Sequence, residues 1–208
     1  LHDALPIWKE ELDVDILDQT NIFHIGSLSL TDQPARDTTF YAVKRAKNKG
    51  SIISYDPNYR ASLWENEEIA KEHMRSLIPY VDIMKISDEE TELLSGYKNV
   101  PEAAEELYRQ GVKIVAITLG RNGTYIYNKE GGRIVDGFAV EHVADTNGAG
   151  DSFWGSFLYK LSQSDKSIDE LTLEELAEYA RFGNAAASLC VENLCVRGKC
   201  PSQSGTDT

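Results

Sequence analysis

Residues 145–151 read Asp-Thr-Asn-Gly-Ala-Gly-Asp, a run that could both hold an anion and remove a proton. Gly148, Ala149 and Gly150 are small enough to let the backbone approach a ligand closely. Apolar residues at helical spacing follow at once, so we expect the turn to open a helix whose free N–H groups attract phosphate or a developing oxyanion. Asp151 falls in the first turn of that helix, where it can act as a base beside the anion. This pairing favours phosphoryl transfer to a hydroxyl.

A purely structural interpretation of the same stretch is also open. An Asp in the first turn of a helix commonly complements the helix dipole, and glycines before a helix commonly form only a turn. The complete run of seven residues is more specific than any Gly-x-Gly within it. It resembles the second signature of the ribokinase-like sugar kinases (phosphofructokinase-B type), Asp-Thr-x-Gly-Ala-Gly-Asp, and every fixed position is present.

Strands and helices must position such a site, and the hydrophobic pattern predicts that they alternate. Apolar runs predict four buried strands, over residues 21–30, 51–55, 81–86 and 112–119. Residues 124–128 and 133–138 flank a Gly-containing turn and predict a hairpin. Helical patterns predict helices from Pro34 to Gly50, over residues 67–79, 88–94 and 101–110, after the signature, and from about Leu173. The alternation predicts an α/β fold, in which a mainly parallel sheet has helices on both faces.

Polar clusters come directly after three of these strands, at residues 56–60, 87–90 and 118–123. Ligands of parallel sheets bind beyond the carboxyl ends of the strands. We therefore expect these clusters and the signature to converge on one crevice. Loops at strand ends are polar in any case, so their position alone does not assign them a function.

The resemblance covers roughly residues 10–191 and implies one domain with the three-layer, Rossmann-like sheet of the ribokinase-like fold. It implies a carbohydrate kinase, a phosphotransferase with an alcohol group as acceptor, most like a fructokinase that converts fructose to fructose phosphate. ATP and Mg²⁺ would be its cofactors, and a small sugar its other substrate. Asp151 would take the proton from the hydroxyl, while Gly148, Ala149 and Gly150 would stabilise charge on the phosphoryl group.

Three further positions match family residues that lie near phosphate or a cation. Arg60 occupies the place of an Arg near the transferring phosphate, although a surface Arg after a turn is the alternative. Glu90 occupies the place of a Glu that helps hold Mg²⁺ through water, and Ser87 stands where the family has Asn. The acidic run around Glu90 also suits the first turn of a helix. Asp145 resembles part of the monovalent-cation site of some members, which adds K⁺ as a candidate ligand.

The resemblance also implies a nucleotide-binding loop and a helix beside the adenine. Thr118, Gly120 and Gly123 match the loop that approaches the ATP phosphates and ribose. Asn184 and Ala187 belong to a Gly-Asn-Ala-Ala-Ala run that matches the adenine-bordering helix, where small residues let a flat ring approach. An Ala-rich core helix is the alternative for this run.

Composition and charge are those expected of a soluble globular enzyme. The chain has 208 residues, 41% of them hydrophobic and 26% charged, which suits one α/β domain. Its net charge of −13, without a Lys/Arg cluster, argues against nucleic acid as a partner. No apolar run approaches a membrane span and no signal peptide is evident, so the cytoplasm is the expected location. Cys190, Cys195 and Cys200 match no common zinc spacing, and His24 is expected to pack in the core.

Residues 1–9 and 192–208 do not resemble the family, and its N-terminal portion, with sugar-gripping residues and a β-sheet lid, has no counterpart here. We therefore expect a chain truncated at the N-terminus that is a poor or inactive kinase by itself. Its first strand would carry an unpaired edge, which would allow a homodimer. A non-catalytic nucleotide-binding remnant of a kinase is the alternative. A dinucleotide-binding oxidoreductase is disfavoured, because no Gly-x-Gly-x-x-Gly follows the first strand.

Overall fold

A six-stranded sheet runs through the computed structural model, which describes residues 7–192. The strands lie side by side in chain order, and they are β1 (Ile22–Ile25), β2 (Ile52–Tyr55), β3 (Ile83–Ser87), β4 (Ile114–Thr118), β5 (Thr124–Asn128) and β6 (Gly131–Val135). Strands β1 to β4 are parallel, and β5 and β6 complete the sheet as an antiparallel hairpin. The predicted mainly parallel sheet is confirmed.

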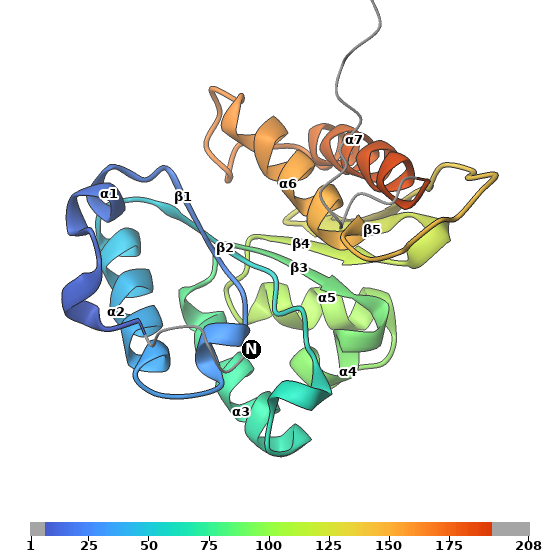
Figure 1. Cartoon of the computed structure of the whole chain (residues 1–208). Helices are drawn as coiled ribbons and strands as arrows, with labels where there is room; N and C mark the ends of the chain where they lie inside the picture. Colours follow the sequence, from blue (N-terminus) through green and yellow to red (C-terminus); the bar gives the residue numbers. More distant parts are fainter. Residues whose placement is uncertain (1–6, 193–208) are drawn as a thin grey trace, which may run out of the picture.

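Helices cover both faces of this sheet, so the fold has three layers (Figure 1). The helices between the parallel strands lie on one face, and they are α2 (Ala35–Asn48), α3 (Glu67–Leu77), α4 (Thr91–Ser95) and α5 (Val100–Arg109). Right-handed crossovers between neighbouring parallel strands put every connecting helix on the same side. The other face is covered by α6 (Ala149–Ser162) and α7 (Leu173–Val191). Further elements are α1 (Val14–Gln19) and 3-10 turns at Lys9–Glu11, Leu28–Leu30, Ala61–Leu63, Ile78–Tyr80, Asp88–Glu90 and Gly120–Asn122.

Alternation of side chains along the strands gives each face of the sheet its own core. Ile53 of β2 packs with the helices α2 to α5, whereas Ile83 of β3 packs with α6 and α7. The same alternation turns Ser54 of β2 and Lys85 of β3 toward α6, where each contacts that helix. Two polar side chains thus lie under the N-terminal part of α6.

The first strand is shorter than the predicted range of residues 21–30 and ends at Ile25. Beyond it, the backbone N–H of Ser27 donates to the carbonyl of Pro57 at 3.2 Å, and the chain enters a 3-10 turn. The strand ends early because this contact with the loop after β2 turns the chain out of the sheet.

The second strand of the hairpin also differs from the prediction, which placed it at residues 133–138. It begins at Gly131, directly opposite Asn128, and ends at Val135. A two-residue turn therefore joins the strands, as is common for hairpins with Gly after the turn. In this register the strand begins and ends closer to the turn than the prediction placed it.

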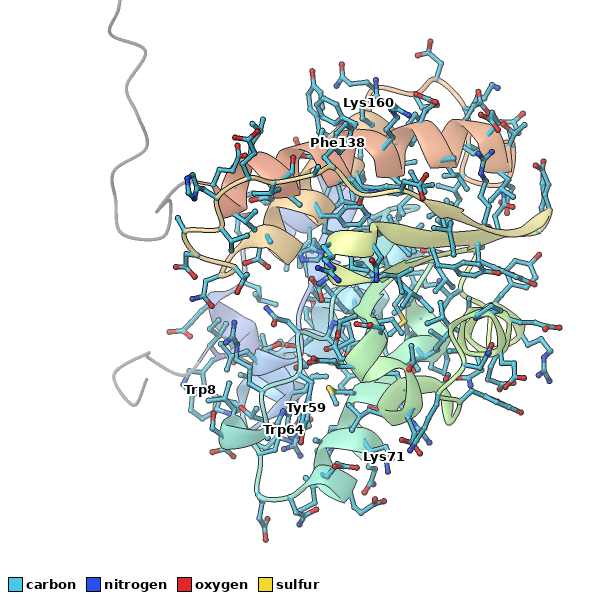
Figure 2. The ribbon with its side chains drawn as sticks, turned by 90° about the vertical axis from the view of Figure 1, so that its right-hand side faces the viewer. Trp8, Tyr59, Trp64, Lys71, Phe138 and Lys160 are labelled. Carbon is cyan, nitrogen blue, oxygen red and sulfur yellow. The ribbon has the colours of Figure 1, made fainter. Side chains whose placement is uncertain are left out.

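The segment that follows β2 is anchored on the side of α2 to α5. Tyr59 packs against that core and Trp64 belongs to it, with its ring stacked on His73 of α3 at a centroid distance of 6.1 Å. Figure 2 shows Tyr59 and Trp64 on this side of the molecule and Phe138 and Lys160 on the opposite side, near α6 and α7. The anchoring holds the loop after β2 in place.

Aromatic side chains and one glycine pack α6 against α7. Phe153, Trp154 and Phe157 of α6 pair with one another at ring-centroid distances of 4.9–6.3 Å, and Phe157 meets Tyr179 of α7 edge-on. A Cβ on Gly183 of α7 would lie 2.6 Å from the Phe153 ring and 2.9 Å from the Phe153 carbonyl oxygen. This close approach holds α6, which begins at the signature, against α7.

Replacing Gly183 by Ala should destabilise the protein by about 1–3 kcal/mol, the usual cost of overpacking a core. The clash outweighs the gain in helix propensity, which is about 1 kcal/mol for Gly→Ala. Gly155→Ala is a matched control in α6, because a Cβ there meets nothing within 4 Å. Denaturation midpoints of the two variants check the difference, and a Gly183→Ala midpoint at or above that of Gly155→Ala would contradict this packing.

Part of the sequence analysis concerns residues outside the described range. The atypical ends expected at residues 1–9 and 192–208 fall largely outside the described range, and Cys195 and Cys200 lie outside it too. Within residues 7–192, Cys190 is a free thiol, and no helix combines the length and apolar character needed to cross a membrane.

Candidate active site

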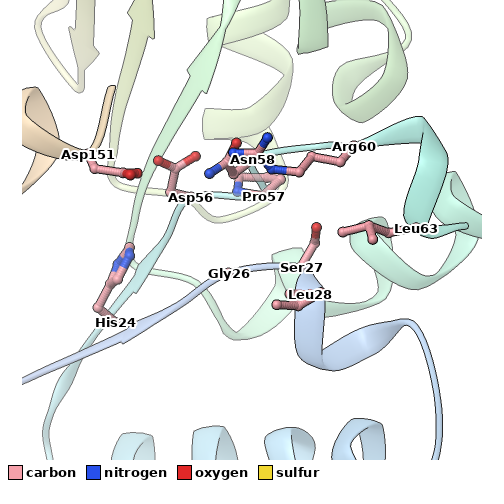
Figure 3. A pocket seen from close by; sticks show the side chains of 10 residues that line it. All are labelled: His24, Gly26, Ser27, Leu28, Asp56, Pro57, Asn58, Arg60, Leu63 and Asp151. Carbon is pink, nitrogen blue, oxygen red and sulfur yellow. The ribbon is translucent and has the colours of Figure 1, made fainter. Parts of the chain in front are cut away.

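A cleft of about 310 Å³ opens at the carboxyl ends of β1 and β2, beside the N-terminus of α6 (Figure 3). It is lined by His24, Gly26, Ser27, Leu28, Asp56, Pro57, Asn58, Arg60, Leu63 and Asp151. This is the strand end at which parallel sheets bind ligands. Of the residues expected to take part in chemistry, Arg60 and Asp151 line the cleft, and both are exposed.

Backbone hydrogen bonds join the ends of β1 and β2 beside the cleft. The N–H of Asp56 donates to the carbonyl of Ile25 at 3.0 Å, next to the bond from Ser27 to Pro57. Asn58 follows with a φ of 47°, in the left-handed region that Asn tolerates better than most residues. The loop that carries Asp56 and Arg60 is therefore held at both strand ends.

Asp56 and Lys85 form a buried ion pair at the cleft wall. Lys85 Nζ lies 2.9 Å from Asp56 Oδ2, and both side chains are at most 7% exposed. Burial raises the pKa of Asp56 to about 6 against the opposing charge of Lys85, and the charges of Glu90 and Asp151 also raise it. The other carboxylate oxygen, Oδ1, is buried and has no hydrogen-bond partner among the described residues. Such an oxygen is a place for a ligand, a water or a cation to bind.

Helix α6 begins at the glycine turn and presents Asp151 to the cleft. Gly148 is its N-cap, with a left-handed φ of 81°, and no side chain caps the first N–H groups. Lys85 reaches the turn from β3, since a Cβ placed on Gly150 would lie 2.9 Å from Lys85 Nζ. Backbone dipoles and a lysine charge can therefore act together on an anion held at this turn.

Glu90 ties the ends of β2 and β3 together. Its Oε1 accepts a hydrogen bond from the backbone N–H of Tyr59 at 2.7 Å, and its Oε2 accepts from the N–H and the hydroxyl of Ser87 at 2.8 and 2.9 Å. The side chain is buried, and Glu90 does not line the cleft described above. Its carboxylate thus has a structural task here, and its contact with Mg²⁺ stays a prediction.

Three of the predicted nucleotide-binding residues lie together at the turn between β4 and β5. Thr118 pairs with Thr124 where the turn begins and ends. Gly120 and Gly123 have φ values of 56° and 97°, and a Cβ on Gly123 would collide with the backbone at Val135. The turn itself therefore requires Gly123. Contact of these residues with a nucleotide stays a prediction.

Asn184 joins α7 to the same hairpin. Its Oδ1 accepts from the hydroxyl of Thr124 at 2.8 Å, and its Nδ2 donates to the carbonyls of Val135 and Asp136 at 3.1 and 3.2 Å. Ala187 packs against the core between the sheet and the two helices α6 and α7. The predicted border of the adenine is thus part of a tightly bonded corner, and its contact with adenine is untested.

Asp145 forms a small turn with Asn147, whose backbone and side-chain N–H groups both donate to Asp145 Oδ1 at 2.9 Å. Among residues 7–192, no three His, Cys, Asp or Glu side chains gather as a metal site. A bound Mg²⁺ would be completed by phosphate oxygens and water, which is its usual environment in proteins. Cation binding by Asp145 stays a prediction.

The sequence analysis missed Lys85 and was wrong about His24, which it placed in the core. The His24 side chain is exposed and lines the cleft. The pairing of His24 with Ser54 in the sheet puts both on the α6 face, a register that the sequence does not reveal. Lys85 did leave a signal, because a Lys inside an apolar strand is rarely buried without a partner.

Comparisons with known proteins agree on one family. The family described as pfkB family carbohydrate kinase matches residues 2–201. The probable fructokinase-2 of Arabidopsis thaliana is 37% identical over 181 residues, which cover 86% of this chain and 54% of the plant protein. Fructokinase-2 of Solanum lycopersicum is 38% identical over 172 residues, which cover 82% of this chain and 52% of that protein. The chain spans about half the length of these curated relatives.

Solved structures have the same fold over the matched region. The fructose-, ADP- and calcium-bound fructokinase of Vibrio cholerae O395 has a TM-score of 0.76 and 28% identity, over 83% of this chain and 55% of that one. The ATP-bound fructokinase of Xylella fastidiosa has a TM-score of 0.80 and 28% identity, over 90% and 60%. Aminoimidazole riboside kinase of Salmonella enterica, complexed with aminoimidazole riboside and an ATP analogue, has a TM-score of 0.74 and 30% identity, over 84% and 57%.

Proposed function

Since this chain belongs to the pfkB family of carbohydrate kinases and has the ribokinase-like fold, we propose that it transfers a phosphoryl group from ATP to a sugar hydroxyl, in the manner of a fructokinase. The observation that carries the proposal is the position of Asp151. It lies on an N-terminus of α6 that no side chain caps, at the wall of a cleft. Fructose is the first candidate sugar, because the curated relatives described above are named fructokinases.

Asp151 is proposed as the general base. Its carboxylate is exposed to the cleft, so a hydroxyl can reach it and transfer its proton as the oxygen attacks the phosphorus. The position of Asp151 in the first turn of α6 keeps the base next to the N–H groups that attract the phosphate. Base and anion site are thus set one residue apart by the chain itself.

The turn at Gly148, Ala149 and Gly150 is proposed to stabilise charge on the transferring phosphoryl group. Its glycines allow close approach, and Lys85 adds a fixed positive charge to the turn. Arg60 lines the same cleft, and its exposed guanidinium would bind a phosphate oxygen. In this arrangement the protein positions the reactants and neutralises charge, as phosphoryl transfer requires.

The carboxylates near the cleft fit Mg²⁺. Oxygen ligands are what Mg²⁺ prefers, and Asp56 Oδ1 is a buried carboxylate oxygen without a partner. Asp56 would hold the ion directly or through water, with Glu90 behind it, and Asp145 would contribute to a K⁺ site. When bound, Mg²⁺ would neutralise charge on the ATP phosphates.

The nucleotide is proposed to lie along the β4–β5 turn. Thr118, Gly120 and Gly123 would approach its phosphates and ribose with their backbone, and α7 would border the adenine at Asn184 and Ala187. The bonded corner around Asn184 supports this, because it holds the turn and the helix in one arrangement.

We further expect a cytoplasmic protein. A homodimer would form through the edge of β1, which has only β2 as a neighbour in the described sheet.

Titrations with fructose and with a non-hydrolysable ATP analogue, separately and together, test the function. Both should bind with dissociation constants in the range of about 1 μM to 1 mM, which is the range of typical KM values. Any ADP release from ATP, which we expect to be slow for this chain by itself, should require the sugar. Binding of the analogue alone would indicate a nucleotide-binding remnant instead of a kinase. Binding of neither ligand would overturn the proposal.

A further inference from the structure

His24 lies at the cleft without a role in the mechanism above. Figure 3 shows its ring turned toward the space in front of Asp151 and Asp56. No hydrogen bond joins His24 to either carboxylate in the described part of the chain. Its ring bonds instead to the protein on one side, where Nδ1 lies 3.0 Å from Ser54 Oγ. The other ring nitrogen, Nε2, is left for the cleft.

The hydrogen bonds of Ser54 determine which nitrogen of His24 carries the proton. Ser54 is fully buried, and its Oγ lies 2.9 Å from Trp154 Nε1. An indole N–H can only donate, so Ser54 Oγ is the acceptor in that bond. The hydroxyl proton of Ser54 also needs an acceptor, and His24 Nδ1 is the one that remains among the described residues. With Ser54 as the donor, His24 Nδ1 accepts, and the neutral ring carries its proton on Nε2.

The surroundings of the ring favour this neutral form. Partial desolvation of the ring at the cleft wall lowers the pKa of His24 against the opposing charge of Asp151. The charge of Lys85 lowers the pKa further, while a contact with the Ser54 backbone raises it. A neutral imidazole with Nδ1 bonded to Ser54 offers one donor, Nε2–H, to the cleft. The cleft thus has a donor on β1 and a carboxylate acceptor on α6.

A donor and an acceptor facing one space suit a molecule with neighbouring hydroxyls. One hydroxyl can give its proton to Asp151 while the oxygen of another accepts from His24. His24 lies on β1 and Asp151 lies on α6. A hydrogen bond between His24 and Ser54, and another between Ser54 and Trp154, connect His24 to the helix that carries Asp151. The distance between the two contacts is therefore set by rigid elements, as selective binding requires.

We propose that His24 binds a hydroxyl oxygen of the sugar through Nε2–H and so positions a neighbouring hydroxyl at Asp151. This assignment rests on the proposed sugar kinase function and extends it to a specificity-determining residue on β1. A site built to hydrogen-bond a hydroxyl rejects an analogue that lacks it, because the donor covered by the bound ligand then has no partner. His24 would accordingly select among sugars that differ at one carbon.

Two substitutions separate the hydrogen bond from the shape of the side chain. His24→Leu removes both ring nitrogens, whereas His24→Gln keeps an amide N–H close to the Nε2 position. Calorimetric titration with fructose should show affinity about tenfold or more weaker for His24→Leu, and partly restored for His24→Gln. Affinity for a non-hydrolysable ATP analogue should stay within about twofold in both variants. A loss of affinity for both ligands, or no rescue by Gln, would indicate a structural role and overturn the proposal.

Singly deoxygenated fructoses locate the hydroxyl. The wild-type protein should bind one of these analogues much more weakly than fructose, and His24→Leu should bind that analogue and fructose equally well. This loss of discrimination is the coupling expected when both changes remove one bond. If His24→Leu weakens binding of every analogue by the same factor, His24 does not contact a particular hydroxyl and the proposal is wrong.

The tautomer gives a test that needs no sugar. Two-bond ¹H–¹⁵N spectra of the free protein should show a neutral His24 ring with its proton on Nε2, and a proton on Nδ1 would overturn the inference.

Failure of the proposed function and failure of this inference give different results. A wild-type protein that binds the ATP analogue but no sugar overturns the proposed function together with this inference. A His24→Leu variant that binds fructose as well as the wild type overturns this inference alone.

Discussion

Replacement of Asp151 by Asn should lower sugar-dependent turnover by a factor of about 10² or more, the usual effect of losing a general base. The amide is nearly isosteric with the carboxylate but cannot accept the proton of the hydroxyl. Asp151 is exposed and makes no ion pair among the described residues, so its replacement should leave the fold intact. Affinity for an ATP analogue should change by less than about tenfold. The comparison requires a form of the protein that contains these residues and turns over sugar.

Asp37→Asn is the matched control for this substitution. Asp37 also lies in the first turn of a helix, α2, but does not line the cleft. If Asp151 served only the helix dipole, both variants would lose a few tenths of a kcal/mol of stability and nothing else, roughly the worth of such a contact. Retention of turnover by Asp151→Asn at the level of Asp37→Asn would reject Asp151 as the base.

Replacement of Gly150 by Val should weaken binding of an ATP analogue by at least about a hundredfold. A Cβ at this position would lie 2.9 Å from Lys85 Nζ, so the end of the lysine side chain must shift. This shift disturbs the ion pair with Asp56, and the valine side chain fills the space through which the backbone approaches phosphate. Gly148→Val should act similarly for another reason, because a left-handed φ of 81° strains any β-branched residue.

Gly155→Val tests whether the effect belongs to the turn. Gly155 lies in the same helix, and a Cβ there meets nothing within 4 Å. Each of the three variants replaces Gly by Val in α6 or at its N-cap, so the change in helix propensity is similar or smaller in each. Calorimetric titration measures binding of the analogue and circular dichroism measures folding, so the two measurements separate these effects. An unchanged affinity of a folded Gly150→Val variant for the analogue would contradict the assignment of the turn to phosphate.

Local patterns in the sequence determined the elements and the start of the site. Apolar runs and helical spacing predicted the four parallel strands, the hairpin and the helices on both faces, because each depends on neighbours a few residues apart. The seven residues from Asp145 to Asp151 indicated the family in the same way, and they also contain Asp151, the proposed base. They form one continuous turn and helix start, so no distant residue was needed to recognise them.

Only the tertiary structure determined which other residues line the cleft and which instead make structural hydrogen bonds away from it. His24 becomes a cleft residue only when β1 pairs with β2 in the observed register, since a shift by one residue would turn its ring to the opposite face. Lys85 gains its partner from Asp56, 29 residues away, and Ser54 bonds Trp154 across 100 residues. Contacts between residues so far apart in the chain leave no periodic trace in the sequence. They arise from the packing of whole strands and helices, and only the folded chain shows them.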